Sequence, residues 1–554
     1  MYHRISPFNI PRLPARFSSS STFPPTPRQR ILSMGRKFVP LLVLSTFLVW
    51  ILGSGVHEQL GFTTFSNNHD FPDFAQYIHK RTISARDLAL DEPDRRLIIV
   101  GDIHGMNHSL HDLLHKLSYK PSTDTLIHLG DIITKSPLSN SLSVLDFFTH
   151  PTHPHQPLFG VRGNHDQTVI EWRGWIDWVE GMVGGKAWLK QLERNFESKF
   201  GGPHDDDDDL KNKREGEMDM EKVGEWVEEE LRKHRGGGKG RWWAKIPKGW
   251  EMFGEHYRVA RALTPSQKAY LLSLPLILHL PSEHVYLVHA GLLPYDPERP
   301  ISDKKQPLAR LPVIPKLSTD SQLSGGGVDG LYGEGEAEQG YDEEAVKRRE
   351  MRKAQEEALI SDVKQNGDPW VVLNLRGVID DTGKITRKAK AGTPWTKIWN
   401  KTMSRCSGYT SHLAPGQDDG EEGGGGVMGG GLPCLPSTVV YGHTASRGLD
   451  VNRWSVGLDS GCAKGGRLTA IVVESSSARV GEGERRRLVE GRSEGGQVVL
   501  GGSGGTRRNE EDEEEDADWL ALEGERVRKE RKDGVIPFGD SGRARVVSVQ
   551  CRKP

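Results

Sequence analysis

The sequence predicts an α/β fold, built as one compact domain that long insertions interrupt. Short apolar segments ending in aspartate, asparagine or histidine recur along the chain. The first three are separated by about thirty residues, the length that a strand–helix–strand crossover requires. In addition, 64 Gly, 32 Pro and 27% charged residues among 554 leave much of the chain outside any hydrophobic core. We therefore expect one folded domain and several polar insertions.

The first strand is expected at 96–100, and Asp102 and His104 follow it. An aspartate and a histidine two residues apart at the end of a strand can bind one metal ion. The glycines on either side allow the turn to pass close to that ion. Apolar residues at helical spacing in 110–117 and 138–148 predict the crossover helices.

The second and third strands are expected at 125–129 and 158–161. Asp131 follows the second strand, and Asn164 and His165 follow the third. The carboxyl ends of neighbouring parallel strands meet at one edge of a sheet, where open α/β sheets place their sites. These polar residues are therefore expected to converge.

Two later apolar segments, 285–289 and 437–443, end in His289 and His443. The earlier one is expected to form a hairpin with 276–280. Thr264 and Pro265 resemble an N-cap and a first-turn proline, which predicts a helix up to about Leu272. Further strands are expected at 369–376, 454–458, 468–473 and 544–551, the last of them pairing with 468–473.

Taken in order, the motifs are Gly-Asp-x-His, Gly-Asp, Gly-Asn-His-Asp, His and Gly-His. In this order the chain resembles the calcineurin-like metallophosphoesterases of the phosphoprotein phosphatase superfamily. Protein Ser/Thr phosphatases read Gly-Asp-x-x-Asp-Arg-Gly at the second motif, whereas this chain reads Gly130-Asp131-Ile132-Ile133-Thr134. That form is similar to the ApaH-like subgroup, whose relatives cleave dinucleoside polyphosphates and inorganic polyphosphate. Within it, the chain most resembles the zinc-dependent vacuolar endopolyphosphatases of fungi.

The resemblance implies a sandwich of two mixed β-sheets flanked by helices, with two divalent metal ions at the strand ends. Mixed imidazole and carboxylate ligands favour Zn²⁺, with Mn²⁺ or Co²⁺ as alternatives, over Mg²⁺ or Ca²⁺. Asp131 would bridge the two ions. By resemblance, the metal ligands are Asp102, His104, Asp131, Asn164, His289 and His443.

The resemblance also makes His165 the general acid that protonates the leaving oxygen. Thr134 stands where protein phosphatases have the aspartate that orients this histidine, which leaves Asp166 or a backbone carbonyl as its partner. Arg162, Lys135 and Arg376 are expected to bind phosphate, because guanidinium and ammonium groups match its oxygens. Weaker candidates along a longer polyanion are Lys397, Arg447, Lys464 and Arg467.

Composition divides the chain into segments. The expected segments are a basic disordered cytosolic tail at 1–37, a transmembrane signal anchor at 38–56, a polar stem at 57–94, a metallophosphoesterase domain at 95–475 with insertions at 201–241, 301–365 and 415–431, a disordered acidic insertion at 476–542 and a C-terminal strand of the domain at 543–554. The second insertion contains a charged helix at 343–360, whose polar face is expected to be solvated. The tryptophans within 171–200 are expected to pack in the core.

Residues 38–56 are uncharged and mostly apolar, and as a helix they would span about 28 Å, enough for a bilayer core. Basic residues precede this segment, so the positive-inside rule predicts a single-pass type II membrane protein whose domain lies in a lumen, by resemblance the vacuole. A cleaved signal peptide, a buried core helix and a mitochondrial leader are the alternatives. Cys406 and Cys434 flank one insertion and would be able to form a disulfide in such a lumen.

The leading functional hypothesis is an endopolyphosphatase that cuts inorganic polyphosphate internally through a water activated by two metal ions. A bis(5'-nucleosyl)-tetraphosphatase and a protein Ser/Thr phosphatase are the alternative enzymes. An inactive membrane-anchored scaffold is the alternative outside enzymes. No nucleic acid partner is expected, and the formal charge of −2 means that any affinity for a polyanion must be local.

Overall fold

The computed structural model describes residues 71–88, 90, 92, 94–153, 156–200, 219–234, 240–314, 343–409, 431–475, 534–540 and 542–552. Residues from Asp73 onward form one compact unit, and the fold below is that of this unit. The expected tail, membrane anchor and most of the acidic insertion lie outside the described residues. Within the described ranges, no helix is both long and apolar enough to cross a bilayer.

The first sheet has the strand order β14-β15-β13-β2-β3-β4. Its members are β2 (Arg96–Val100), β3 (Asp124–His128), β4 (Leu158–Gly160), β13 (Arg467–Glu474), β14 (Val535–Phe538) and β15 (Gly542–Gln550). The first three motif strands are parallel neighbours, with Val100 opposite His128 and His128 opposite Gly160. The ends of β2, β3 and β4 therefore meet at one edge of the sheet.

The second sheet has the order β1-β5-β6-β10-β12-β11. Its strands are β1 (Ile78–Thr82), β5 (Pro275–Leu280), β6 (Val285–Val288), β10 (Thr438–Tyr441), β11 (Asp450–Val451) and β12 (Ser455–Gly457). β5 and β6 form the expected antiparallel hairpin, and β6 is parallel to β10. Both sheets mix parallel and antiparallel pairs, as the resemblance implied.

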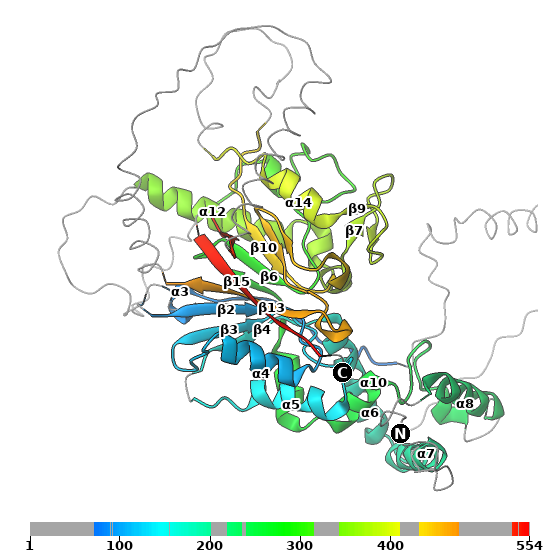
Figure 1. The fold of residues 1–554 in the computed structure, drawn as a ribbon. Coiled ribbons are helices and arrows are strands. Elements are labelled where there is room, and N and C mark those ends of the chain that lie inside the picture. Colours follow the sequence, from blue (N-terminus) through cyan, green and yellow to red (C-terminus); the bar gives the residue numbers. More distant parts are fainter. Residues whose placement is uncertain are drawn as a thin grey trace, which may run out of the picture. The chain divides into compact units, whose positions relative to one another are not determined.

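Helices cover the outer faces of the two sheets (Figure 1). Those after the first motif strands are α4 (Asn107–Lys116), α5 (Leu138–Thr149), α6 (Asn164–Gly181), α7 (Gly185–Phe200), α8 (Met220–Lys233), α9 (Gly240–Trp243), α10 (Glu255–Ala262) and α11 (Pro265–Ser273). The remaining elements are α3 (Ala85–Leu88), α12 (Glu343–Ser361), α13 (Pro369–Asn374), α14 (Trp395–Met403) and the small sheet of β7 (Gly377–Val378), β8 (Ile385–Thr386) and β9 (Thr393–Pro394).

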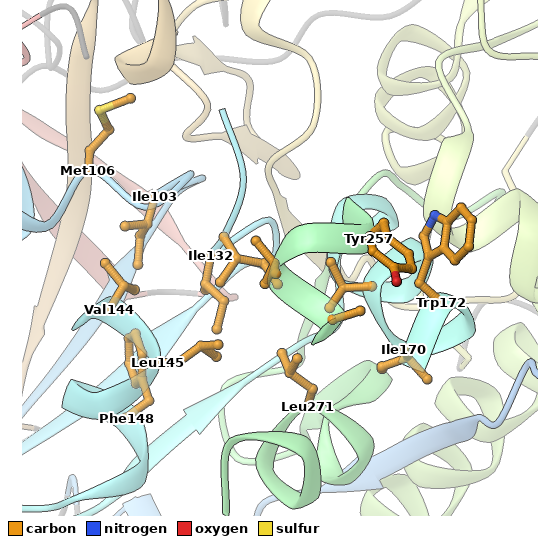
Figure 2. Packing of buried hydrophobic residues seen from close by; sticks show 14 of the residues in the cluster. Ile103, Met106, Ile132, Val144, Leu145, Phe148, Ile170, Trp172, Tyr257 and Leu271 are labelled. Atoms are coloured by element: carbon orange, nitrogen blue, oxygen red, sulfur yellow. The ribbon is translucent and has the colours of Figure 1, made fainter. Parts of the chain in front are cut away.

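The core has three layers, and β2 shows why. Side chains alternate across a strand, so Leu97 and Ile99 point between the two sheets, where they pack with Leu278 and Leu287 of the second sheet. Ile98 and Val100 point to the outer face, into the cluster under the helices. Figure 2 shows part of that cluster, including Ile103, Val144 and Leu145. Burial on both faces explains why the motif strands are continuous apolar runs.

Several local predictions are confirmed. β15 pairs antiparallel with β13, with Val549 opposite Leu468, so the chain returns to the first sheet after a long excursion. Helix α11 begins at Pro265, and Thr264 caps it by accepting a hydrogen bond from the backbone N–H of Gln267. Of the three tryptophans of α6, Trp172 and Trp175 are buried in the core, and Trp178 packs against it partly buried.

Other predictions are wrong. Residues 369–374, within the segment 369–376 expected as a strand, form the helix α13, because Asp368 caps its first turn and a proline occupies its first position. Residues 78–82, within the expected stem, form β1 of the second sheet. Residues 535–538, at the end of the expected disordered insertion, form β14. Part of the first insertion, 220–233, forms α8, whose apolar face is buried.

The polar face of α12 is solvated as expected over 344–350 but not in the second half of the helix. Glu356 is only 1% exposed, and its carboxylate lies 2.8 Å from Nε2 of His279 and 2.7 Å from Nδ1 of His284. Arg352 lies one turn earlier and donates to the same carboxylate at 2.9 Å. Burial alone would raise the pKa of Glu356, but these partners outweigh it and lower the pKa to about 2. The second insertion is therefore joined to the second sheet by a buried ion network.

Two disulfides link cysteines in the C-terminal part of the chain. One joins Cys406 to Cys434, the pair that flanks the third insertion, and the other joins Cys462 to Cys551. The second bridge ties the turn before β13 to the residue after β15. Each disulfide limits the freedom of the unfolded chain, which stabilises the fold.

Candidate active site

The turns that carry the motif residues have unusual backbone geometry. His104, Asp131 and His443 each follow a strand and have positive φ angles of 49°, 48° and 66°. A residue with a side chain adopts this left-handed conformation at some cost in energy, so the surroundings must enforce it. Strained turns of this kind concentrate at functional sites.

The first group of motif residues is a buried cluster at the ends of β2 and β3. Asp102, His104 and Asp131 are 3%, 5% and 2% exposed, and each offers a ligand atom within 4.8 Å of the others. Nε2 of His104 lies 3.9 Å from Oδ2 of Asp102 and 3.7 Å from Oδ2 of Asp131. One metal ion would therefore be within reach of all three side chains.

The second group is next to the first. Nε2 of His289 lies 3.0 Å from Oδ1 of Asn164 and 3.4 Å from Oδ2 of Asp131. The rings of His289 and His443 are 4.9 Å apart. The same oxygen of Asp131 thus lies between His104 of the first group and His289 of the second, which is the position that a bridging carboxylate takes.

Backbone carbonyls select which nitrogen each histidine presents. Nδ1 of His289 lies 2.8 Å from the carbonyl oxygen of Leu129, and Nδ1 of His104 lies 3.4 Å from that of Ile133. Because a carbonyl only accepts, Nδ1 carries the proton in both rings, and the Nε2 atoms face Asp131. Outer hydrogen bonds of this kind commonly orient histidines that bind metals.

The donor set fits divalent metal ions. Among the described residues, the buried Nε2 atom of His443 has no hydrogen-bond partner, and such atoms are rare unless an unseen ion or water satisfies them. Imidazole nitrogens and carboxylate oxygens in one cluster suit Zn²⁺ or Mn²⁺. Asp102, His104 and Asp131 would hold one ion, and Asp131, Asn164, His289 and His443 the other.

Electrostatics supports a site built for positive charge. Burial, helped by the charge of Asp459, raises the pKa of Asp102 well above its ordinary value. Burial lowers the pKa of His104 to about 3. Burial would also lower the pKa of His289, but the carboxylate of Asp131 outweighs it and raises the pKa to about 9. Buried carboxylates in such a cluster require cations to balance them.

A pocket of about 230 Å³ opens beside this cluster. Its walls include His104 and His443 together with the cations Lys135, Arg376 and Lys464. The ammonium of Lys135 lies 2.9 Å from Nε2 of His104, and Arg376 donates to the carbonyl of His443 at 3.1 Å. The cations come from three separate segments. The pocket is therefore locally rich in positive charge, although the net charge of the chain is −2.

Arg162 is not placed in that pocket. Its side chain is fully buried, and its guanidinium donates to the carbonyls of Leu271 and Leu272 at 3.1 and 2.9 Å and to Gln167 at 3.0 Å. The predicted contact between Arg162 and the substrate does not agree with this position. Arg162 instead holds the third motif against the end of α11.

The predicted acid, His165, has a partner that sequence reasoning missed. Its Nδ1 lies 2.9 Å from Nε2 of His256, at the start of α10. The candidate partner Asp166 is engaged elsewhere, since it accepts from the backbone N–H groups of Gly163 at 2.9 Å and Ile132 at 3.2 Å. Asp459, another missed residue, is a buried carboxylate on the pocket wall. Asp459 follows the strand expected at 454–458, so the strand-end pattern could have marked it. No local pattern marks His256.

Residues 95–264 match the family model of the calcineurin-like phosphoesterases. Over this stretch the chain is similar to the metallophosphoesterase domains of that family. It contains the first three motifs and His256, while His289 and His443 lie beyond it. The metal-binding cluster above is consistent with this assignment.

Known proteins are similar to parts of this chain. Serine/threonine-protein phosphatase 2 of Escherichia coli (strain K12) is 41% identical over 99 residues, which is 18% of this chain and 42% of that protein. The symmetrical bis(5'-nucleosyl)-tetraphosphatase of Coxiella burnetii is 34% identical over 90 residues, 16% of this chain and 29% of that protein. The chain therefore spans less than half the length of these relatives.

A solved structure, provisionally assigned as a diadenosine tetraphosphatase, is 20% identical to this chain. The alignment covers 72% of this chain and 94% of that one, with a TM-score of 0.31.

Proposed function

We propose that this metallophosphoesterase is a metal-dependent hydrolase of phosphoanhydride bonds, an endopolyphosphatase that cuts inorganic polyphosphate internally. The observation that carries the proposal is the position of Asp131 Oδ2, 3.7 Å from His104 and 3.4 Å from His289, beside a pocket lined by cations. Two ions sharing one carboxylate are typical of enzymes that displace groups at phosphorus.

The protein's own groups would each have a defined task. When bound, the divalent ions supply an acidified water and withdraw charge from the phosphoryl group. Lys135 and Arg376 bind the phosphate oxygens at the pocket wall. His165 provides the proton for the leaving oxygen from Nε2, because His256 occupies its Nδ1.

The pocket lining favours an inorganic polyanion over a nucleotide. Besides its histidines, cations and Asp459, it consists of the small residues Ala389, Ala445, Ser446, Gly461 and Ala463. Among the described residues that line it, there is no Trp, Tyr or Phe on which an adenine would stack. Phosphate oxygens, in contrast, would find Lys135, Arg376 and Lys464 in the lining.

Hydrolysis of dinucleoside polyphosphates and of phosphoproteins are the competing activities. The named relatives include a bis(5'-nucleosyl)-tetraphosphatase and a Ser/Thr phosphatase, but each match covers only a part of the domain. Thr134 stands in place of the aspartate in the second motif of protein phosphatases. This difference weighs against hydrolysis of phosphoproteins.

The deciding experiment uses the full-length chain in detergent, loaded with Zn²⁺, Mn²⁺ or Co²⁺. Long-chain polyphosphate, diadenosine tetraphosphate and a phosphoserine peptide are offered separately, and the products are resolved on gels. Polyphosphate fragments of intermediate length that appear before free phosphate support the proposal. Rapid cleavage of the dinucleotide with none of polyphosphate would overturn it.

The matched control is Asp131→Asn, which keeps the size of the side chain but removes the shared charge. We expect turnover to fall by more than about 100-fold. This is more than the loss expected when a residue that only hydrogen-bonds to a metal ligand is changed. If the protein were a scaffold without enzymatic activity, this variant would keep its full cellular role. The variant therefore distinguishes the scaffold from the enzyme.

We also propose that the enzyme is a type II membrane protein with its domain in an oxidising lumen, such as the vacuole. The apolar segment at 38–56 and the pairs Cys406–Cys434 and Cys462–Cys551 support this, because disulfides persist in oxidising compartments. Protease protection of the domain in sealed vesicles tests it, and digestion without detergent would contradict it.

A further inference from the structure

The contact between His165 and His256 joins two helices. His165 is the second residue of α6 and His256 the second residue of α10. Their rings are stacked, with centroids 5.0 Å apart and planes inclined by 16°, and Nδ1 of His165 lies 2.9 Å from Nε2 of His256. A hydrogen bond at this distance requires one ring to donate and the other to accept.

The pair rests on a rigid support. One residue further along α10, the ring of Tyr257 packs edge-on against Trp172 of α6 at 5.1 Å, and both residues are buried (Figure 2). Arg173 of α6 also donates to the carbonyl of Ala260 at 3.4 Å. Helix α10 is therefore held firmly against α6, and His256 with it.

The same end of α10 reaches the second motif. The carboxylate of Glu255 accepts a hydrogen bond from the backbone N–H of Lys135. The backbone N–H of His165, in turn, donates to Oδ1 of Asp131 at 2.9 Å. The start of α10 thus contacts both the turn that carries Lys135 and the histidine that lies beside Asp131.

The second motif offers no carboxylate to the Nδ1 atom of His165. Thr134 is fully buried, and among the described residues its hydroxyl has no hydrogen-bond partner. Asp166 is occupied by backbone N–H groups. His256 is the side chain found at the Nδ1 atom of His165.

We propose that His256 is a positioning residue, which fixes the ring of His165 by its Nδ1 so that Nε2 faces the leaving group. This inference rests on the proposed function, in which His165 donates the proton. A neutral imidazole suits the task, because its Nε2 can accept a hydrogen bond from Nδ1–H of a His165 that carries protons on both nitrogens, without adding charge near the metal ligands. Burial lowers the pKa of His256 to about 4, which agrees with a neutral ring.

The test compares full-length wild type with His256→Ala and His256→Gln. Glutamine is the conservative variant, because its side-chain amide reaches about as far as Nε2 of histidine. His111→Ala, a change of an exposed histidine on α4, is the matched control. Each protein is loaded with metal, its bound metal is counted, and its hydrolysis of phenyl phosphate, p-nitrophenyl phosphate and polyphosphate is measured.

We expect His256→Ala to keep its bound metal and its KM but to lose about 10- to 100-fold in kcat on phenyl phosphate, part of what general acid catalysis contributes. The loss on p-nitrophenyl phosphate should be much smaller, because its leaving group needs no proton. Glutamine at this position, or imidazole added to the alanine variant, should restore part of the rate. Equal losses on both aryl esters, or loss of metal, would overturn the proposal.

A readout that needs no turnover separates this inference from the proposed function. A crystal structure of His256→Ala is expected to show the His165 ring rotated away from its present orientation. An unchanged ring would contradict the positioning role. If wild type hydrolyses none of the phosphates while carrying its metal ions, the proposed function fails, and the ring orientation still decides whether His256 positions His165.

Discussion

The backbone N–H of His443 lies 3.1 Å from each carboxylate oxygen of Asp102, although the two residues are 341 positions apart. Asp102 follows β2 of the first sheet and His443 follows β10 of the second. The site therefore lies where strand ends from both sheets of the sandwich meet, and one motif residue helps to orient another.

Gly442 leaves room for this contact. A Cβ atom at this position would lie 2.0 Å from Oδ1 of Asp102, so Gly442→Ala must displace the carboxylate. We expect fewer metal ions per chain and a loss of about 10- to 100-fold in activity, measured by elemental analysis and steady-state assay. Gly181→Ala is the control, because no atom lies within 4 Å of its added methyl. Full metal content in Gly442→Ala would argue against the close approach.

Glu356 should make stability depend on pH. Its folded pKa is about 2, below the ordinary value of 4.5, so its contribution is complete above 4.5 and is lost as pH falls through about 2. We expect Glu356→Gln to lower the free energy of unfolding at neutral pH by about 3 kcal/mol and to flatten its decline between those pH values. Urea unfolding at a series of pH values measures both.

The neighbouring residue provides the control for Glu356. Glu357 forms a partly exposed ion pair with Lys80, and its side chain is 46% exposed. Exposed pairs contribute less than about 1 kcal/mol, so Glu357→Gln should change stability little. Equal effects of the two substitutions would show that the buried network does not stabilise the fold.

Arg162 should matter for stability more than for substrate binding. Its buried guanidinium donates to the carbonyls of Leu271 and Leu272. Arg162→Met leaves these acceptors unsatisfied, which we expect to cost about 2 to 4 kcal/mol in the free energy of unfolding. The KM for polyphosphate should stay within about twofold of wild type. A large rise in KM with unchanged stability would show instead that Arg162 contacts the substrate.

Lys464 should contribute to the binding of long polyanions. It lines the same pocket as His104 and His443, and an ammonium acts on phosphate as a point charge. We expect Lys464→Ala to raise the KM for polyphosphate by about 3- to 10-fold at low salt, and less at high salt because ions screen exposed charges. Kinetics at several salt concentrations checks this. Lys190→Ala, on the exposed side of α7, is the matched control and should leave KM unchanged.

Much of the fold follows from local patterns in the sequence. The apolar motif strands, their crossover helices and the capped start of α11 are each specified by residues close together in the chain. The pairing of β15 with β13 was predicted from the alternation of apolar and polar residues in 544–551. A strand with one buried face shows such a period of two. The likeness of the motifs to a known family indicated the ligand positions, which the structure brings together at adjoining strand ends.

The sequence by itself determined which residues stand at the ends of the motif strands, because a strand's direction and periodicity are local properties. Only the tertiary structure decided where each side chain points and what reaches it from afar. Arg162 adjoins a motif but turns into the core, and His256 belongs to no motif but meets His165. Glu356 of α12 is buried because the second sheet supplies His279 and His284 to pair with it. Such contacts depend on packing between distant segments, which no local pattern encodes.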